Sequence, residues 1–412
     1  MLRDPSIDLF TRTLGITEPW FVEKVDFSHE DRRIDIKINF RESAKFPCPA
    51  CESKNVEIYD TKERTWRHLD CFQYATYLHA RMPRVWCHDC TRIRGAGVKT
   101  VLLDWARPGS HFTLFFESYV LTLAREMPVL AVARIVGESD DRIWNIIHHY
   151  VDEAREKEDF SDVRKLAVDE TAATRGHNYV TIAADSEAKR VLFATPGKGA
   201  DTIASFREDF VAHNGDPDKI EVVSCDMSPA FIQGTHNAFP SAKITFDKFH
   251  VSKLLGDAVD EVRRNEQKSH PELKRSRYLW LMNPSRLKAE QQNFLNTLSQ
   301  QHLKAAKAYQ IRMNFAQLWE QPKDFAETFL KKWYFWATHS RLGPVIRAAK
   351  TIRKHKEGIL SWFDTHVNNA IIESLNSLIQ AAKRRAKGYR SSRNLVAIIY
   401  LLLSKLDFGL PT

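Results

Sequence analysis

The chain has 412 residues, of which 43% are hydrophobic and 27% are charged, the balance of an ordinary globular protein. At roughly 100–200 residues per domain, this length predicts about two to four domains. The 15 Gly and 16 Pro exclude a collagen-like chain and a long disordered tract. The longest apolar run, 395–403, is far shorter than the roughly 20 residues of a membrane span. We therefore expect a soluble, cytoplasmic protein that makes no contact with membranes.

Positive charge is concentrated in one part of the chain. The whole sequence has 61 Lys and Arg against 52 Asp and Glu, a net charge of +9, and residues 341–393 alone hold 12 basic and three acidic residues. A local excess of this kind is typical of a surface that binds a polyanion such as nucleic acid. A solvated helix face would give the same count, so charge alone does not decide between the two.

The first segment, 1–105, contains five of the six cysteines and strand-like alternation. Cys48-Pro-Ala-Cys51 and Cys87-His-Asp-Cys90 are two Cys-x-x-Cys motifs, each of which can present two thiolates to one ion at a tight turn. Four thiolates leave no open coordination position, so the pattern predicts a structural Zn²⁺ and not a catalytic one. A redox role for either pair is the alternative.

The stretch between the two motifs predicts the β-hairpin of a zinc ribbon. Alternation places four side chains on one side of this hairpin: Phe72, Tyr74, Thr76 and Leu78. Three histidines could replace a cysteine as ligand: His68, His79 and His88. The two remaining cysteines, Cys71 and Cys225, are expected to be buried apolar residues.

Residues 106–160 predict a helix-turn-helix. Two short helices would meet at Gly137-Glu138-Ser139, where Ser139 can cap the second helix. Four side chains are expected to be buried between them: Val132, Val136, Ile143 and Ile146. The second helix would enter the major groove of DNA and present Arg142, Asn145, His148 and His149. Asp140 and Asp141 would repel phosphate there, so an ordinary helical hairpin is the alternative.

Residues 161–250 alternate β-branched runs with helical patterns, as an α/β domain does. Strands are predicted at 166–170, 179–185, 190–195, 220–226 and 242–246, with a helix at 201–213. This order is that of a ribonuclease H-like core, in which the first and fourth strands are neighbours. Asp169 and Asp226 would then lie side by side, where their oxygens could bind Mg²⁺ or Mn²⁺. Two such ions can support phosphoryl transfer.

A third carboxylate must come from elsewhere in the chain, and the candidate is Glu373 in the helical stretch that follows residue 365. A helical wheel places Asn369, Asn376, Gln380 and Arg384 on the face of Glu373. The opposite stripe, expected to dock on the sheet, is Ile371, Leu375, Leu378 and Ala382. The rival acids are Asp185, Asp247, Glu357 and Asp364. The same helix continues through Lys383, Arg384, Arg385 and Lys387 toward Gly388, a plausible stop signal.

Taken in order, these parts resemble the insertion-sequence transposases of the ISL-three family. The resemblance rests on the two cysteine motifs with Trp66-Arg-His-Leu-Asp70 between them, and on the helix-turn-helix. It continues in four further motifs: Val168-Asp169-Glu170, Asp226-Met-Ser, Asp247-Lys-Phe-His250, and the helix from Asn369 to Gly388. It covers nearly the whole chain except the first 40 residues.

The resemblance implies a DDE transposase of multidomain α+β class. Its parts would be a zinc ribbon within 1–105, a helix-turn-helix in 106–160, and a ribonuclease H-like core in 161–250 and 361–412, interrupted by a helical insertion at 251–360. Asp169, Asp226 and Glu373 would be the catalytic residues and magnesium ligands, supported by Asp247 and His250. Six residues are candidates for DNA contact: Arg142, Asn145, Lys383, Arg384, Arg385 and Lys387.

A transposase of this kind would bind double-stranded DNA, both the terminal inverted repeats of its element and the target. It would act as a homodimer on DNA in the bacterial cytoplasm, associated with the nucleoid when bound. Two alternatives stay open. One is a DNA-binding regulator with an inactive core, and the other is a metal-dependent nuclease that cuts without strand transfer.

Overall fold

The structure is a computed structural model that describes residues 4–411 except 91–96, 175, 177, 283–285, 301–302 and 368–369. The chain divides into two compact units, Met1–Tyr150 with Asp407–Thr412, and Val151–Leu406. This division is coarser than the five predicted segments, whose boundaries stay predictions. No helix in the described part of the chain is long and apolar enough to cross a bilayer.

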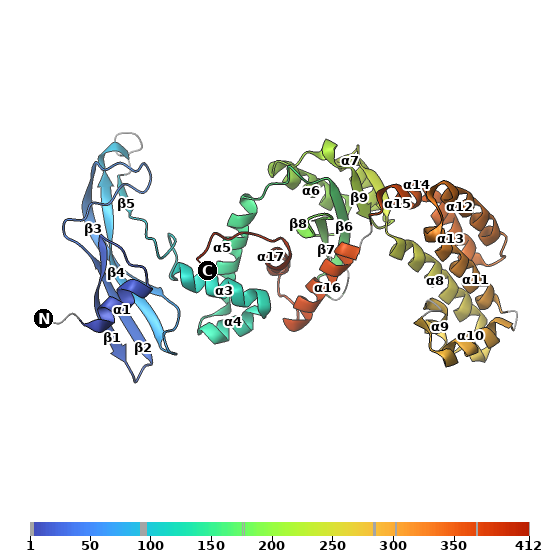
Figure 1. Ribbon diagram of the computed structural model, residues 1–412, viewed down its shortest axis with the longest axis horizontal. Coiled ribbons are helices and arrows are strands. Elements are labelled where there is room, and N and C mark those ends of the chain that lie inside the picture. Colours follow the sequence, from blue (N-terminus) through green and yellow to red (C-terminus); the bar gives the residue numbers. More distant parts are fainter. Residues whose placement is uncertain are drawn as a thin grey trace. The chain divides into compact units, whose positions relative to one another are not determined.

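The first unit begins with a five-stranded sheet and one short helix (Figure 1). Its elements are α1 (Pro5–Thr13), β1 (Trp20–Ser28), β2 (Arg33–Phe40), β3 (Val56–Arg67), β4 (Ala75–Cys87) and β5 (Val98–Thr100). The strand order is β1-β2-β4-β3, and β5 pairs with β4. The predicted hairpin is therefore β3 and β4, and the first 40 residues extend its sheet.

Three tryptophans belong to the hydrophobic core of this sheet. Trp20 and Trp66 each meet the ring of Trp105 edge-on, at centroid distances of 5.1 and 6.2 Å. Thr76 and Leu78 are buried as the alternation predicts. The prediction for Phe72 was wrong, because this residue lies in the connection between β3 and β4 with a positive φ and is 90% exposed.

Three further helices follow among the described residues: α3 (Leu114–Glu126), α4 (Val129–Val136) and α5 (Asp140–Glu156), and the boundary between the two units falls within α5, after Tyr150. The turn between α4 and α5 forms as predicted, because Gly137 adopts the left-handed conformation that ends α4. The expected apolar residues are all buried: Val132, Val136, Ile143 and Ile146. Two helices joined by a glycine turn, each with buried apolar side chains, are therefore present as predicted.

The second unit contains a mixed sheet with helices around it. Its first elements are β6 (Lys165–Ala172), β7 (Tyr179–Asp185), β8 (Arg190–Pro196), α6 (Ala200–Ala212), β9 (Val222–Cys225), α7 (Pro229–Ala238) and β10 (Lys243–Phe246). The strand order is β10-β9-β6-β7-β8. β6, β7 and β8 are antiparallel, whereas β9 and β10 run parallel to β6. This confirms the predicted adjacency of the first and fourth strands.

Helices follow β10 to the end of the chain (Figure 1). They are α8 (Lys248–Glu266), α9 (Arg277–Leu281), α10 (Ala289–Gln300), α11 (Lys304–Ala316), α12 (Lys323–Thr338), α13 (Gly343–Lys354), α14 (Lys356–Leu360), α15 (Trp362–Thr365), α16 (Ala370–Arg385) and α17 (Ser392–Leu403). The chain returns to the sheet at α14, where Gly358 lies so close to the Phe246 ring that a Cβ would stand 2.3 Å from it. The helical region thus leaves and rejoins the sheet beside β10.

Candidate active site and metal centre

Four cysteines gather at the end of the β3–β4 hairpin. Their sulfur atoms all lie within 4.8 Å of one another, with Cys48–Cys90, Cys51–Cys87 and Cys51–Cys90 separations of 3.7, 3.6 and 3.5 Å. A tetrahedral site with zinc–sulfur bonds of about 2.3 Å has sulfur–sulfur edges of about 3.8 Å. The cluster therefore fits one tetrahedral Zn²⁺ with no vacant position.

The local backbone favours the thiolate form of Cys48, whereas hydrogen bonding among the sulfurs and burial raise the pKa of the Cys90 thiol. Burial works against ionisation of the Cys48 thiol, but hydrogen bonds from the amides of Ala50 and Cys51 lower its pKa to about 7. The alternative ligands are bound elsewhere, since His68 contacts Thr113 at 2.9 Å and His79 contacts Asp35 at 2.6 Å. His88 likewise reaches Glu57 at 3.2 Å. Among the described residues, the ligand set that comes together is the predicted set of four cysteines.

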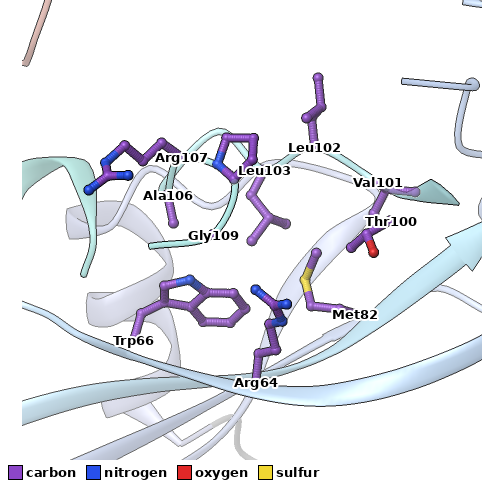
Figure 2. Close-up of a pocket in the computed structure, with 11 residues that line it drawn as sticks. Arg64, Trp66, Met82, Thr100, Val101, Leu102, Leu103, Ala106, Arg107 and Gly109 are labelled. Carbon is purple, nitrogen blue, oxygen red and sulfur yellow. The ribbon is translucent and has the colours of Figure 1, made fainter. Parts of the chain in front are cut away.

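The Trp66–Asp70 motif links the β3–β4 hairpin to the segment just before α3. Arg67 is buried, forms an ion pair with Asp70, and exchanges backbone hydrogen bonds with His111 and Thr113 just before α3. Figure 2 shows Trp66 in the wall of a cavity of about 200 Å³ between the hairpin and residues 100–109. None of the residues predicted to bind metal or DNA lines this cavity.

The predicted DNA-reading residues of α5 differ in their surroundings. Asn145 is exposed. Arg142 forms an ion pair with Glu138 on the preceding turn, and its guanidinium lies 4.7 Å from the centroid of the Phe112 ring. Base contact by Arg142 would therefore require the Glu138 pair to open, whereas Asn145 needs no such change.

Three aspartates belong to three neighbouring strands of the second sheet: Asp169 lies within β6, and Asp226 and Asp247 come directly after β9 and β10. The parallel register pairs Lys165 with Val222 and Val222 with Lys243. The same offsets, continued along the strands, place Asp169 opposite Asp226 and Asp226 opposite Asp247. Successive residues of a strand alternate between its faces, so this register points three carboxylates toward one region. The sheet thus builds an acidic cluster from residues 78 positions apart in sequence.

Asp169 is the most perturbed member of this cluster. Its Oδ1 accepts the amide of Glu170 at 2.8 Å, and its Oδ2 accepts the Asn376 side-chain amide of α16 at 2.7 Å. Burial raises the pKa of Asp169 to about 6, and the charge of Asp226 adds to this, while the amide bond and His250 oppose it. These hydrogen bonds hold the Asp169 carboxylate in place, but they do not offset the cost of burying its negative charge beside Asp226.

Glu373 joins the cluster from α16. Burial and the nearby charge of Asp247, with which it shares a hydrogen bond, raise the pKa of Glu373. Asp247 is 4% exposed, and its Oδ2 has no partner among the described residues. Among the described residues, the four cysteines are the only group of three or more metal-ligating side chains whose ligand atoms all lie within 4.8 Å of one another. The acids are neighbours but stand further apart than a closed metal site requires.

Comparison with known proteins agrees with this geometry. The profile of an ISL3 transposase domain matches residues 166–399, which include all four acids. The chain belongs to the ISL3 family of transposases. The profile described as the helix-turn-helix domain of transposase family ISL3 matches residues 101–151 of this transposase. The zinc finger of the IS204/IS1001/IS1096/IS1165 transposases matches residues 44–90, so the zinc-ribbon, helix-turn-helix and DDE parts are all confirmed.

Two curated relatives align with the transposase along most of its length. The transposase for insertion sequence element IS1001 of Bordetella parapertussis is 28% identical over 393 residues, covering 92% of this chain and 94% of the relative. The transposase for insertion sequence element IS1557 of Mycobacterium tuberculosis is 25% identical over 440 residues, covering 97% and 96%. The protein is accordingly an enzyme of the DDE transposase family that binds DNA through its helix-turn-helix and transposase domains.

The helix α16 of the transposase docks differently from the wheel prediction. Its buried stripe is Ile372, Leu375, Ile379 and Ala382, whereas Leu378 is 51% exposed, so the expected stripe was wrong at two of its four positions. The polar side touches β6, because Gln380 donates to the Thr171 hydroxyl at 2.8 Å and Lys383 donates to the Ala172 carbonyl at 2.5 Å. Asn369 lies outside the described residues.

The remaining cations of this helix point outward. Arg384, Arg385 and Lys387 are exposed, and α16 ends at Arg385. Gly388 follows with a positive φ and donates its amide to the Lys383 carbonyl at 2.9 Å, as the stop signal predicts. Lys383, by contrast, is only partly exposed and is bonded to the Ala172 carbonyl.

Two of the four rival acids, Asp185 and Asp364, are engaged elsewhere. Asp185 accepts the amides of Glu187 and Ala188 in the β7–β8 turn, and Asp364 forms an ion pair with Lys323 at 2.5 Å. One neighbour was missed from the sequence: the pKa of Glu170 is raised by burial and by the charge of Asp226. Its place directly after Asp169 was the available signal.

Proposed function

We propose that this transposase binds the terminal inverted repeats of its insertion sequence and catalyses metal-dependent cleavage and strand transfer, with Asp169, Asp226 and Glu373 as catalytic residues. The observation that carries the proposal is the acidic cluster within β6 and directly after β9 and β10, faced by α16. Family membership supports the class of reaction, and the cluster supports the choice of residues.

The cluster is suited to a hard divalent cation, Mg²⁺ or Mn²⁺. Asp247 Oδ2 and Asn376 Oδ1 are buried oxygens that lack a partner among the described residues. Buried polar atoms without partners are costly, and oxygen ligands are those that Mg²⁺ binds. Asp169, Asp226 and Glu373 would hold the ion, and a closer approach of α16 to the sheet would bring their oxygens together.

When bound, such ions activate the attacking oxygen and stabilise the leaving oxygen of a phosphodiester. The chain's own residues prepare the site. Asn376 fixes the rotamer of Asp169 through its side-chain amide, and Ser228 donates its backbone amide to Asp226 Oδ1 at 2.8 Å. His250 favours the Glu373 carboxylate by its charge, whereas Asp247, whose charge opposes ionisation, shares a hydrogen bond with Glu373. These contacts orient the acids before DNA arrives.

The residues proposed to contact DNA fall into two groups, those that read bases and those that bind phosphates. Asn145 and Arg142 on α5 would read base edges at the element ends, and the exposed Arg384, Arg385 and Lys387 would contact phosphates with Lys383 behind them. The enzyme would act as a homodimer on DNA, and the four cysteines would hold a structural Zn²⁺.

The test is incubation of purified protein with the DNA that flanks its own gene, in Mg²⁺, followed by mapping of 3′-OH ends and of joints to a target plasmid. We expect cleavage at the element ends and joined products, both lost in Asp169→Asn, Asp226→Asn and Glu373→Gln but kept in the control Asp185→Asn. Cleavage without joints would indicate a nuclease, and binding without cleavage would indicate an inactive-core regulator. Normal cleavage by Glu373→Gln would contradict its assignment.

A further inference from the structure

A cluster of arginines surrounds one buried carboxylate in the helical region. Asp260 on α8 is 7% exposed, and it accepts hydrogen bonds from Arg263 at 2.7 and 2.9 Å. Arg264 on α8 and Arg277 at the start of α9 approach its other oxygen with their Nε atoms, at 3.3 and 3.5 Å. With Asp257, these residues line an open surface cavity of about 370 Å³ that carries a net charge of +1.

The three arginines do not have the same role. Arg263 is buried and also bonds the Gln267 side chain and the Leu273 carbonyl, so its donors are used inside the protein. Arg264 and Arg277 have side chains 60% and 54% exposed and reach Asp260 through Nε. The Nη groups of Arg264 and Arg277 make no hydrogen bond or ion pair with the described residues. Asp260 therefore holds two guanidinium groups whose outer donors face solvent.

The segment around this cluster is strongly basic. Residues 263–288 contain eight Lys and Arg and two acids, Glu266 and Glu272, and lie outside the 341–393 block. Both acids are occupied, because Glu266 accepts the amides of Lys304 and Ala305 at the start of α11, and Glu272 pairs with His270 at 3.0 Å. Neither acid neutralises the arginines, so the segment presents positive charge.

We propose that Arg264 and Arg277 form a binding site for DNA backbone phosphate, separate from the helix-turn-helix and from α16. Guanidinium groups bind phosphate oxygens through paired donors, and here Asp260 orients two of them before binding. The site is sequence-independent, because it offers only charge and donors to phosphate. The proposal rests on the proposed function only in taking DNA as the ligand.

The experiment measures the affinity of the full-length protein for a short duplex of unrelated sequence over a series of salt concentrations. Each lost phosphate contact reduces the slope of log K against log salt by about 0.9. The variant Arg264→Gln with Arg277→Gln should therefore show a slope smaller by about 2 and weaker binding. The matched control, Lys157→Gln with Lys219→Gln, removes two charges whose partners are Glu153 and Asp216 and should keep the wild-type slope.

A second variant separates geometry from charge. Arg264→Lys with Arg277→Lys keeps both charges but loses the paired donors, so its affinity should lie between those of wild type and the Gln variant. Unchanged slope and affinity in the Gln variant, or an equal loss in the control, would overturn the proposal. Failure of the proposed function would be seen separately, as a wild-type protein that does not cleave element ends.

Discussion

Replacing Asp169 with asparagine should make the transposase more stable at neutral and alkaline pH while abolishing catalysis. The carboxylate is buried beside Asp226, and its pKa is raised from 3.8 to about 6. An amide of the same shape carries no charge to desolvate. Asn376 can accommodate it by turning its own side-chain amide, because its Oδ1 has no partner among the described residues.

The size of the effect follows from the raised pKa. A group whose folded pKa lies above its unfolded value contributes stability that is present below the unfolded pKa and is lost as pH rises through the folded one. For Asp169 that window runs from about pH 4 to above pH 6. A shift of about two units corresponds to about 3 kcal/mol. The variant should thus be more stable than wild type by up to about 3 kcal/mol at pH 8, with little difference at pH 4.

The assay is urea unfolding of wild type and Asp169→Asn at several pH values. The buffer should be free of magnesium and of chelator, so that zinc stays bound. Adding Mg²⁺ at pH 8 should then stabilise wild type and not the variant, because ions that bind only the folded state raise its stability. Asp185→Asn is the control, since that carboxylate accepts turn amides, and it should gain no stability.

The reasoning would be refuted by an Asp169→Asn protein whose stability at pH 8 equals or falls below that of wild type while the two agree at pH 4. It would also be refuted if Mg²⁺ stabilised both proteins equally, since the ion would then bind elsewhere.

Three further predictions concern the other parts of the chain. Cys51→Ser should lower zinc content measured by elemental analysis and loosen the ribbon, because a structural site loses much of its affinity with one thiolate. Removing the charges of Arg384 and Arg385 should weaken binding to all DNA sequences alike and flatten the salt dependence. Tyr150→Phe should destabilise the first unit in thermal unfolding by about 1.5–3 kcal/mol, because its hydroxyl donates to the fully buried Glu117 at 2.6 Å.

Each of these has a matched comparison. Cys71→Ser lies outside the four-sulfur cluster and should leave the zinc content unchanged, so an equal loss would contradict the assignment. Asn145→Ala should reduce the preference for element ends more than the general affinity, the reverse of the α16 variants. A Tyr150→Phe protein as stable as wild type would show that Arg107 and Ser110, which also bond Glu117, satisfy it alone.

Local features of the sequence determined much of this protein. Cysteine spacing identified all four members of the sulfur cluster, because each Cys-x-x-Cys turn is a local structure. Gly137 marked the end of α4, because few other residues adopt its left-handed backbone. The order of strands and helices, being that of a ribonuclease H-like core, predicted that the first and fourth strands are neighbours and therefore that Asp169 and Asp226 lie side by side.

The tertiary structure decided what depends on contacts between distant segments. Register across three strands placed Asp247 in line with Asp169 and Asp226, and no local pattern contains that offset. The wheel of α16 located its polar side but not its rotation against β6, which buried Ile372 and Ile379 instead of Ile371 and Leu378. The arginine cluster forms only because folding brings Arg277, at the start of α9, to the same carboxylate that Arg264 approaches from α8, that of Asp260. Strand register, the rotation of a helix against a sheet and contacts between distant helices are set by packing in three dimensions. A turn or a Cys-x-x-Cys motif, in contrast, is complete within a few consecutive residues.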